Sequence, residues 1–168
     1  PFLESALNDG FLKAPSNEKM NFYIMWANHN VKRNYWNYHR YGDDTSLLFD
    51  ATVNWDQFKT IVDRVIKQYF SRPNYVKIDG CPVFSIFDIG LFMRSFGSVE
   101  EAAKAIEYFR SEVVKAGFKG LHLQESAGGG GKLSPEQIAY KRNYEEKLGI
   151  NSMALYNMGG FDCDYLKH

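Results

Sequence analysis

The residues from Asn21 to Asn30, NFYIMWANHN, place an aromatic ring, an amide and an imidazole directly after a run of apolar side chains. A continuous apolar run is typical of a parallel β-strand whose two faces are both covered. In barrels of this class, the residues just past the carboxyl end of a strand form the active-site mouth. The Trp26 ring could cover the apolar face of a sugar while Asn28 and His29 bind its hydroxyls. A core tryptophan followed by an ordinary loop would give the same run, so the pattern alone leaves both interpretations open.

Carboxylates follow two further apolar runs of the chain. Asp88 comes after PVFSIF, and Glu125 comes after LHLQ. Most glycoside hydrolases place two carboxylates on opposite sides of the scissile bond, so Asp88 and Glu125 are candidates to face one sugar-binding cleft. Both could instead bind loop backbone or a neighbouring Lys or Arg. Tyr156 and Asn157, at the last apolar run, complete the predicted substrate-binding set, and the catalytic residues stay unassigned.

Several other kinds of site find little support in the sequence. The glycine-rich run at 127–134, AGGGGKLS, lacks the first Gly and the Ser or Thr of a phosphate-binding P-loop. It also lacks the last Gly of the dinucleotide motif, which weakens a doubly wound nucleotide domain as an alternative. None of the four histidines has the partner four residues away that a helical zinc site needs, and no G-x-S-x-G elbow occurs. We therefore expect neither a metal nor a cofactor.

The charge balance argues against two classes of partner. The chain has 20 Lys plus Arg and 20 Asp plus Glu, so it offers no net charge to attract nucleic acid or an anionic membrane. No apolar run approaches the ~20 residues of a membrane span. Cys81 and Cys163 do not have the spacing of a redox or zinc motif, and a buried free thiol is expected for Cys81.

Helical and strand-like patterns alternate along the 168 residues, which we interpret as one domain, 1–168. Apolar runs predict four strands, near 22–28, 82–88, 120–125 and 152–157. Capping residues and helical spacing predict four helices, at 2–14, 54–70, 98–116 and 134–148. The alternation predicts an α/β fold with a parallel sheet. The polar and aromatic segment 29–53 is too long for an ordinary connection and is expected to be functional or mobile.

Two elements of the sequence, taken together, resemble one protein family. Trp26-Ala27-Asn28 ends the first predicted strand, and Tyr75 to Phe84 follows the pattern Y-x-K-x-D-G-x-P-V-F. With the opening PFLESALNDGFLKAP, they resemble the WbsX-like proteins, also called the glycoside hydrolase family 99-like domain, over nearly the whole chain. The resemblance implies a (β/α)8 TIM barrel that acts on polysaccharide, with relatives that cleave α-mannosides. It also implies a bacterial secreted, periplasmic or cell-envelope location.

The resemblance further implies that the chain is a fragment, roughly the third to sixth strands of the barrel with their helices. The acidic pair of the family is expected in a later N-E-W-x-E-G-type motif, which this sequence lacks, so the chain alone is not expected to hydrolyse α-mannosides. Asn30-Val31 stands where Asn-Trp often follows W-A-N. The alternative is a non-hydrolytic carbohydrate-binding or polysaccharide-assembly protein, associated with glycosyl transfer. A partial barrel would leave Phe84, Ile86 and Leu155 without neighbours, so self-association, or association with the missing barrel portion, is expected.

Overall fold

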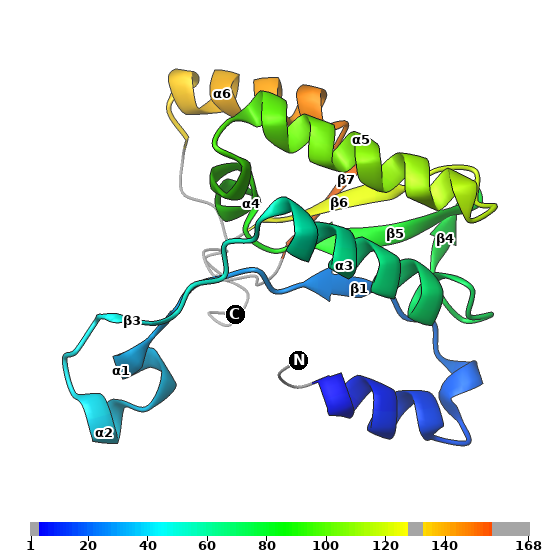
Figure 1. Cartoon of the computed structure of the whole chain (residues 1–168), viewed down its shortest axis with the longest axis horizontal. Coiled ribbons are helices and arrows are strands. Elements are labelled where there is room, and N and C mark those ends of the chain that lie inside the picture. Colours follow the sequence, from blue (N-terminus) through cyan, green and yellow to red (C-terminus); the bar gives the residue numbers. More distant parts are fainter. Residues whose placement is uncertain (1–3, 128–132, 156–168) are drawn as a thin grey trace, which may run out of the picture.

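The computed structural model describes residues 4–127 and 133–155. Four strands form a parallel sheet in the order β1-β5-β6-β7, which confirms the predicted strands and their common direction. Their bounds are β1 Ile24–Trp26, β5 Cys81–Ile86, β6 His122–Ala127 and β7 Ser152–Leu155. Because all four run the same way, their carboxyl ends lie along one edge of the sheet (Figure 1).

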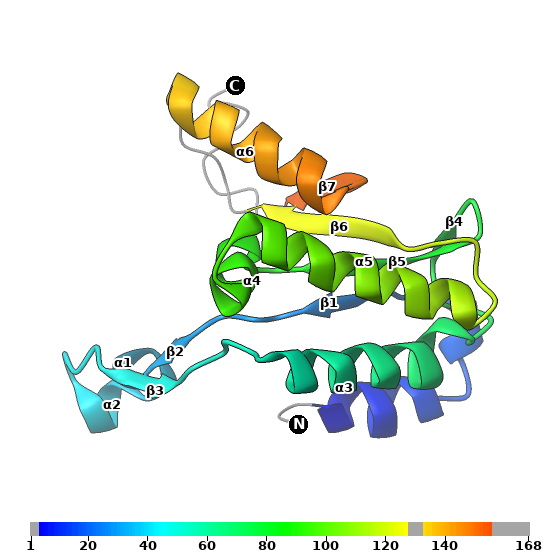
Figure 2. The same cartoon turned by 45° about the horizontal axis from the view of Figure 1, so that its top comes forward.

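Helices separate the strands along the chain, as Figure 2 shows. They share one apolar core with the strands. The bounds are α3 Trp55–Val65, continued by the π-helical turn η4 Ile66–Phe70, then α4 Ile89–Phe96, α5 Val99–Lys115 and α6 Pro135–Leu148. The N-terminal segment, predicted as one helix, instead forms short π and 3₁₀ turns. These are η1 Ala6–Gly10, η2 Phe11–Lys13 and η3 Asn17–Lys19.

The residues predicted to cap the starts of three helices do so in the structure. Reciprocal capping boxes form between Asn54 and Gln57 at α3 and between Ser134 and Gln137 at α6. Ser98 caps α5 by accepting a hydrogen bond from the Glu101 N–H at 3.1 Å. The Glu101 carboxylate pairs with Lys104. Of the capping box predicted at Ser98, the bond to the serine side chain is therefore present, whereas the Glu101 carboxylate binds Lys104, one turn further along the helix.

Helix α4 is not among the helices that the sequence predicts. Its residues, IGLFMRSF, follow strand β5 so closely that the apolar run reads as one continuous stretch. The Oδ1 of Asp88 accepts a hydrogen bond from the Leu91 N–H at 2.7 Å and so satisfies a donor of the first turn. A carboxylate that the sequence proposes as a site residue is therefore also the N-cap of a helix.

One face of the sheet is buried under the helices. Phe84, Ile86 and Leu123 have no exposed surface and lie in the core with residues of α3, α4 and α5. This corrects the expectation that Phe84 and Ile86 lack neighbours, because that expectation placed them on the opposite face. Leu155 on β7 is 54% exposed. Its register with Ala127 places it on the face of Glu125, so it is not on the opposite face that the expectation assumed.

A hairpin and a tyrosine close the amino end of the sheet. Strand β4, Lys77–Ile78, pairs antiparallel with β5 across Asp79-Gly80. Both turn residues have positive φ, 53° and 84°, as a type I′ turn requires, which confirms the predicted tight turn. The Tyr75 hydroxyl donates to the Val83 carbonyl at 2.6 Å and accepts from the Ile24 N–H at 3.1 Å, so it joins β5 to β1. Burial raises the pKa of Tyr75.

Residues 31–49 form a small projection after β1, here named the aromatic lobe (Figure 1). Strands β2 Val31–Lys32 and β3 Leu47–Phe49 pair antiparallel, and the one-turn helices α1 Arg33–Trp36 and α2 Tyr38–Tyr41 lie between them. Every residue of the lobe is at least partly exposed. The long segment predicted at 29–53 therefore has secondary structure of its own.

Candidate functional site

The Asn28 side chain joins the carboxyl ends of β1 and β5. Asn28 is only 2% exposed. Its Nδ2 donates to the Asp88 carbonyl at 2.7 Å, and its Oδ1 accepts from the Asp88 N–H at 2.9 Å. The pair continues the link between the strands past their last backbone bond, from the Phe87 N–H to the Trp26 carbonyl at 3.0 Å. The predicted sugar-binding amide therefore holds two strand exits side by side.

Asp88 lies at the same edge of the sheet and is half-buried. One of its carboxylate oxygens, Oδ1, caps α4. A Cβ at position 90 would lie 3.3 Å from that oxygen, so Gly90 keeps the space beside the carboxylate open. The Asp88 carboxylate thus has a structural role, and its contact with a sugar stays a prediction.

His29 is an exposed polar side chain at this edge of the sheet. Its ring lies against Phe87, with the ring centroids 5.2 Å apart. The next residue, Asn30, accepts a hydrogen bond from the Ala51 N–H at 2.8 Å, which closes the base of the aromatic lobe. The imidazole is therefore held by a neighbouring ring and a fixed loop, and it remains accessible to a ligand.

The Trp26 ring turns toward the helices. Its centroid lies 6.3 Å from Phe58 and 6.2 Å from Phe92, and the side chain is half-buried against the core. The signal for this orientation is in the sequence, since Phe22, Ile24 and Trp26 alternate along one face and all three pack on the core. Sugar stacking by Trp26 stays a prediction, and the observed contacts are those of a packing residue.

Glu125 also faces the helices, where it binds two side chains of α6. It is 5% exposed, and its carboxylate accepts from Lys141 Nζ at 2.9 Å and from the Tyr144 hydroxyl at 3.0 Å. Burial lowers the pKa of Lys141, but the hydrogen bonds and charge of Glu125 outweigh it, so the pKa of Lys141 is raised. Burial, together with the nearby Glu125 charge, raises the pKa of Tyr144 to about 12. The cluster fastens α6 to β6, and sugar contact by Glu125 stays a prediction.

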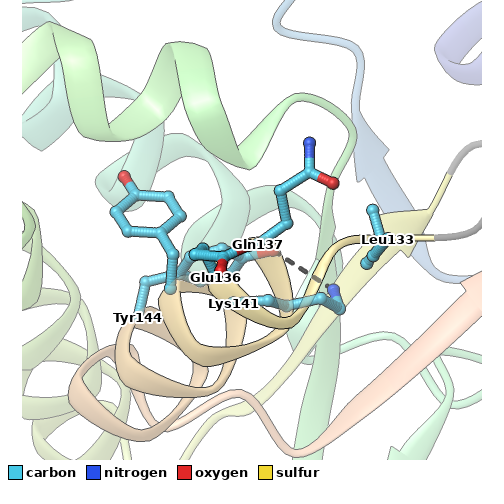
Figure 3. A pocket seen from close by; sticks show the side chains of 6 residues that line it. Leu133, Glu136, Gln137, Lys141 and Tyr144 are labelled. Carbon is cyan, nitrogen blue, oxygen red and sulfur yellow. Dashed lines mark hydrogen bonds between the residues drawn. The ribbon is translucent and has the colours of Figure 1, made fainter.

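Two shallow hollows lie beside α6. The first, of ≈ 420 Å³, is shown in Figure 3 and is lined by Leu133, Glu136, Gln137, Tyr140, Lys141 and Tyr144. The second, also of ≈ 420 Å³, lies between α4, the start of α5 and α6, and shares Tyr140 and Tyr144 with the first. Neither lining includes Trp26, Asn28, His29, Asp88 or Glu125, the predicted site residues that the structure describes.

Two predicted site residues, Tyr156 and Asn157, lie outside the described residues, as does Cys163. Cys81 is a half-buried free thiol. Within 4–127 and 133–155, no group of three or more His, Cys, Asp and Glu side chains is arranged to hold a metal ion. In the same part of the chain, no helix combines the length and apolar character needed to cross a membrane.

Comparison with models of known protein families gives a match for this chain. Residues 2–157 match the family described as Glycosyltransferase WbsX. The chain belongs to the WbsX family. No curated protein and no solved structure shows significant similarity to it. Membership of the WbsX family confirms the resemblance found in the sequence and indicates a carbohydrate-active protein, without distinguishing transfer of a glycosyl group from hydrolysis.

The residues that carry the WbsX resemblance have structural roles in this chain. Tyr75 and the Asp79-Gly80 turn organise the amino end of the sheet, through the β1–β5 bridge and the β4–β5 hairpin. Asn28 ties the same two strands together at the carboxyl end. The two motifs therefore fix β1 and β5 relative to each other at both ends, through contacts within the chain itself.

One polar cluster of this WbsX chain was missed by sequence reasoning. Ser85, Gln124 and Ser152 share a register level on the face of the sheet opposite the helices. Ser152 Oγ lies 2.8 Å from His122 Nε2 and 3.3 Å from Gln124 Nε2. Ser85 Oγ and Gln124 Oε1 are shielded from water and have no hydrogen-bond partner among the described residues. The alternation of Leu121 and Leu123 with polar neighbours was the available signal.

Proposed function

We propose that this chain binds an oligo- or polysaccharide at the carboxyl edge of its parallel sheet. The observation that carries the proposal is the double hydrogen bond between Asn28 and the Asp88 backbone. It holds two neighbouring strand exits together and leaves the exposed His29 beside them. Parallel α/β folds bind ligands at this edge because the loops that follow the strands converge there.

The proposal includes a barrel as the parent fold, of which this chain would supply roughly the third to sixth strands. Sequential strand order without a reversal supports a barrel over an open doubly wound sheet. A polar row on the face opposite the helices also supports it, because that face would be the barrel interior. An open sheet covered by helices on both sides would carry apolar residues there.

The predicted site residues take two kinds of role in this proposal. His29 and Asp88 contact the sugar, and Tyr156 and Asn157 orient further hydroxyls from the end of β7. Trp26, Asn28 and Glu125 act by positioning, since their contacts are with the core, with Asp88 backbone and with α6. The Asn28 bridge supports this division, because an amide already bound on both of its polar atoms is poorly placed to bind a hydroxyl as well.

For the intact protein we propose hydrolysis of glycosidic bonds in a polysaccharide, with α-mannosides as the substrate and the bacterial envelope or exterior as the location. The second candidate is a role in glycosyl transfer or polysaccharide assembly without hydrolysis. It is favoured by the family description, Glycosyltransferase WbsX, and by the ion pair that occupies Glu125. The two candidates share a bound glycan and differ in whether new reducing ends appear.

Calorimetry with mannobiose and with soluble α-mannan tests the binding step. His29→Ala should weaken binding about tenfold, the usual consequence of losing one hydrogen bond to a ligand. Met20→Ala, an exposed side chain near the opposite edge of the sheet, is the matched control and should bind as the parent does. No binding by the parent, or equal binding by His29→Ala, would contradict the proposal.

A reducing-end assay on the same α-mannan tests where the chemistry lies. We expect no turnover from this chain, because the acidic pair implied by the family resemblance is not in it. Asp88→Asn is the informative variant, since asparagine caps a helix as well as aspartate does while removing the charge. Turnover that disappears in Asp88→Asn would show that this segment itself carries a catalytic carboxylate.

A further inference from the structure

The aromatic lobe exposes large rings on an ordered backbone. Tyr35 is 90% exposed, Tyr38 62% and Phe49 59%. The β2–β3 pairing and the hydrogen bond from the Arg33 N–H to the Ser46 carbonyl, at 3.0 Å, define the backbone that carries them. Isolated exposed apolar side chains are ordinary, but a gathering of this kind on a soluble protein marks a binding surface.

The lobe is continuous with the candidate site at the sheet edge. It begins two residues after His29, and the Asn30 side chain binds the Ala51 N–H at its base. Figure 1 shows it projecting beyond the carboxyl end of β1. A ligand that extends from His29 by more than one sugar would therefore meet the lobe.

The chemistry of the lobe suits a neutral polymer. The Tyr41 ring is already covered by the guanidinium groups of Arg33 and Arg40, at 5.5 and 5.3 Å, while Tyr35 and Tyr38 stay exposed. The charged residues nearly balance, as Lys32, Arg33, Arg40, Asp43 and Asp44. Arg33 Nε and Asn34 Oδ1 are shielded from solvent and have no hydrogen-bond partner among the described residues, so neither atom presents itself to a ligand. Flat rings beside amides and a small net charge match a polyhydroxylated, uncharged ligand better than an acidic one.

We infer that the aromatic lobe binds the continuing chain of a neutral polysaccharide, with Tyr35 and Tyr38 stacking on sugar rings at least two beyond the one at His29. The inference rests on the proposed function and adds to it that the ligand is a polymer, recognised over several sugars. The exposed Leu47 and Leu48 of β3 would also suit a protein partner, and the experiment separates the two.

The test compares a short and a long ligand on the 168-residue chain. Mannobiose affinity is measured by calorimetry, and retention by soluble α-mannan is measured by affinity electrophoresis. Tyr35→Ala with Tyr38→Ala should weaken retention by the polymer about tenfold for each ring, while mannobiose affinity stays at the parent value. Tyr35→Phe with Tyr38→Phe keeps both rings and should restore retention. Tyr140→Ala, an exposed tyrosine on α6, is the matched control and should behave as the parent does.

Each other outcome overturns the inference in a distinguishable way. Equal polymer retention by the double alanine variant would show that the lobe does not bind the glycan. Equal losses for mannobiose and polymer would show that the rings act on the site through structure. A parent dimer in sedimentation, lost in the alanine variant with glycan binding intact, would assign the lobe to a protein interface. A parent that binds neither ligand would refute the proposed function itself.

Discussion

Removing the Asn28 side chain should separate the two strand exits on which the proposed site depends. Asn28→Ala deletes two hydrogen bonds, of 2.7 and 2.9 Å, and leaves the N–H and the carbonyl of Asp88 without their partners. Each group stranded in a partly buried place costs about 1–3 kcal/mol, and water can reach part of this edge. We therefore expect a loss of about 2–3 kcal/mol, or about 4–12 °C in Tm for a chain of this length.

The charge variant Asn28→Asp gives the same contact a pH dependence. Its carboxyl still accepts from the Asp88 N–H, but its second oxygen faces the Asp88 carbonyl in place of a donor. Burial and this repulsion raise the pKa of the introduced carboxyl above its unfolded value of about 3.9. A raised pKa gives stability that is present below the unfolded value and is lost as the pH rises through the folded value. The variant should therefore be weakest near neutrality and recover near pH 4.

Urea unfolding followed by circular dichroism measures both variants. Asn143→Ala is the matched control, because it removes an exposed amide from α6 and should change the free energy of unfolding by less than about 0.5 kcal/mol. The m-value should stay constant, since the folded and unfolded surfaces are nearly unchanged. If Asn28→Ala unfolds at the urea concentration of the parent, the bridge does not hold the exits together and the reasoning fails.

Three further predictions concern contacts away from this bridge. Tyr75→Phe removes the hydroxyl between β1 and β5 and should cost about 2 kcal/mol in urea unfolding, whereas an unchanged midpoint would contradict its bridging role. The hydrogen bond from Arg64 lowers the pKa of Glu4 below 4.5, so the contact stabilises the fold above that pH and is lost as the pH falls through the folded pKa. Measured as Tm against pH, this dependence should disappear in Glu4→Gln. Glu125→Gln breaks the ion pair with Lys141, so amide hydrogen exchange in α6 should become faster while glycan affinity stays unchanged. A loss of glycan affinity without faster exchange would instead place Glu125 in the binding site.

The strands and the main helices could be predicted because local signals and tertiary burial agree. Apolar runs marked the four parallel strands, and Asn54 and Ser134 marked helix starts that the structure confirms. Helix α4 could not be separated from β5, since only Phe87 and Asp88 lie between the apolar strand and the apolar helix, and Phe87 is itself apolar. The aromatic lobe has strands and helices of four residues or fewer, which are too short for a periodic pattern to show.

The site was harder to predict because residues at strand exits also serve the fold. Asp88 and Asn28 were expected to face a ligand, and both bind backbone in the structure. Trp26 and Glu125 were expected at the mouth, but alternation along β1 and β6 places them beside Ile24 and Leu123 on the helix face. Counting in twos from a core residue would have given these orientations from the sequence.

Mapping a bound glycan onto backbone amides tests whether the glycan binds at the carboxyl edge of the sheet. The ¹⁵N-labelled chain is titrated with an α-mannan oligosaccharide, and amide chemical shifts are followed residue by residue. We expect saturable shifts at His29, Asn30 and Asp88, at the carboxyl edge of the sheet, and none at the Asp79-Gly80 turn at the amino edge. Shifts confined to the Asp79-Gly80 turn, or no shifts at saturating oligosaccharide, would contradict it.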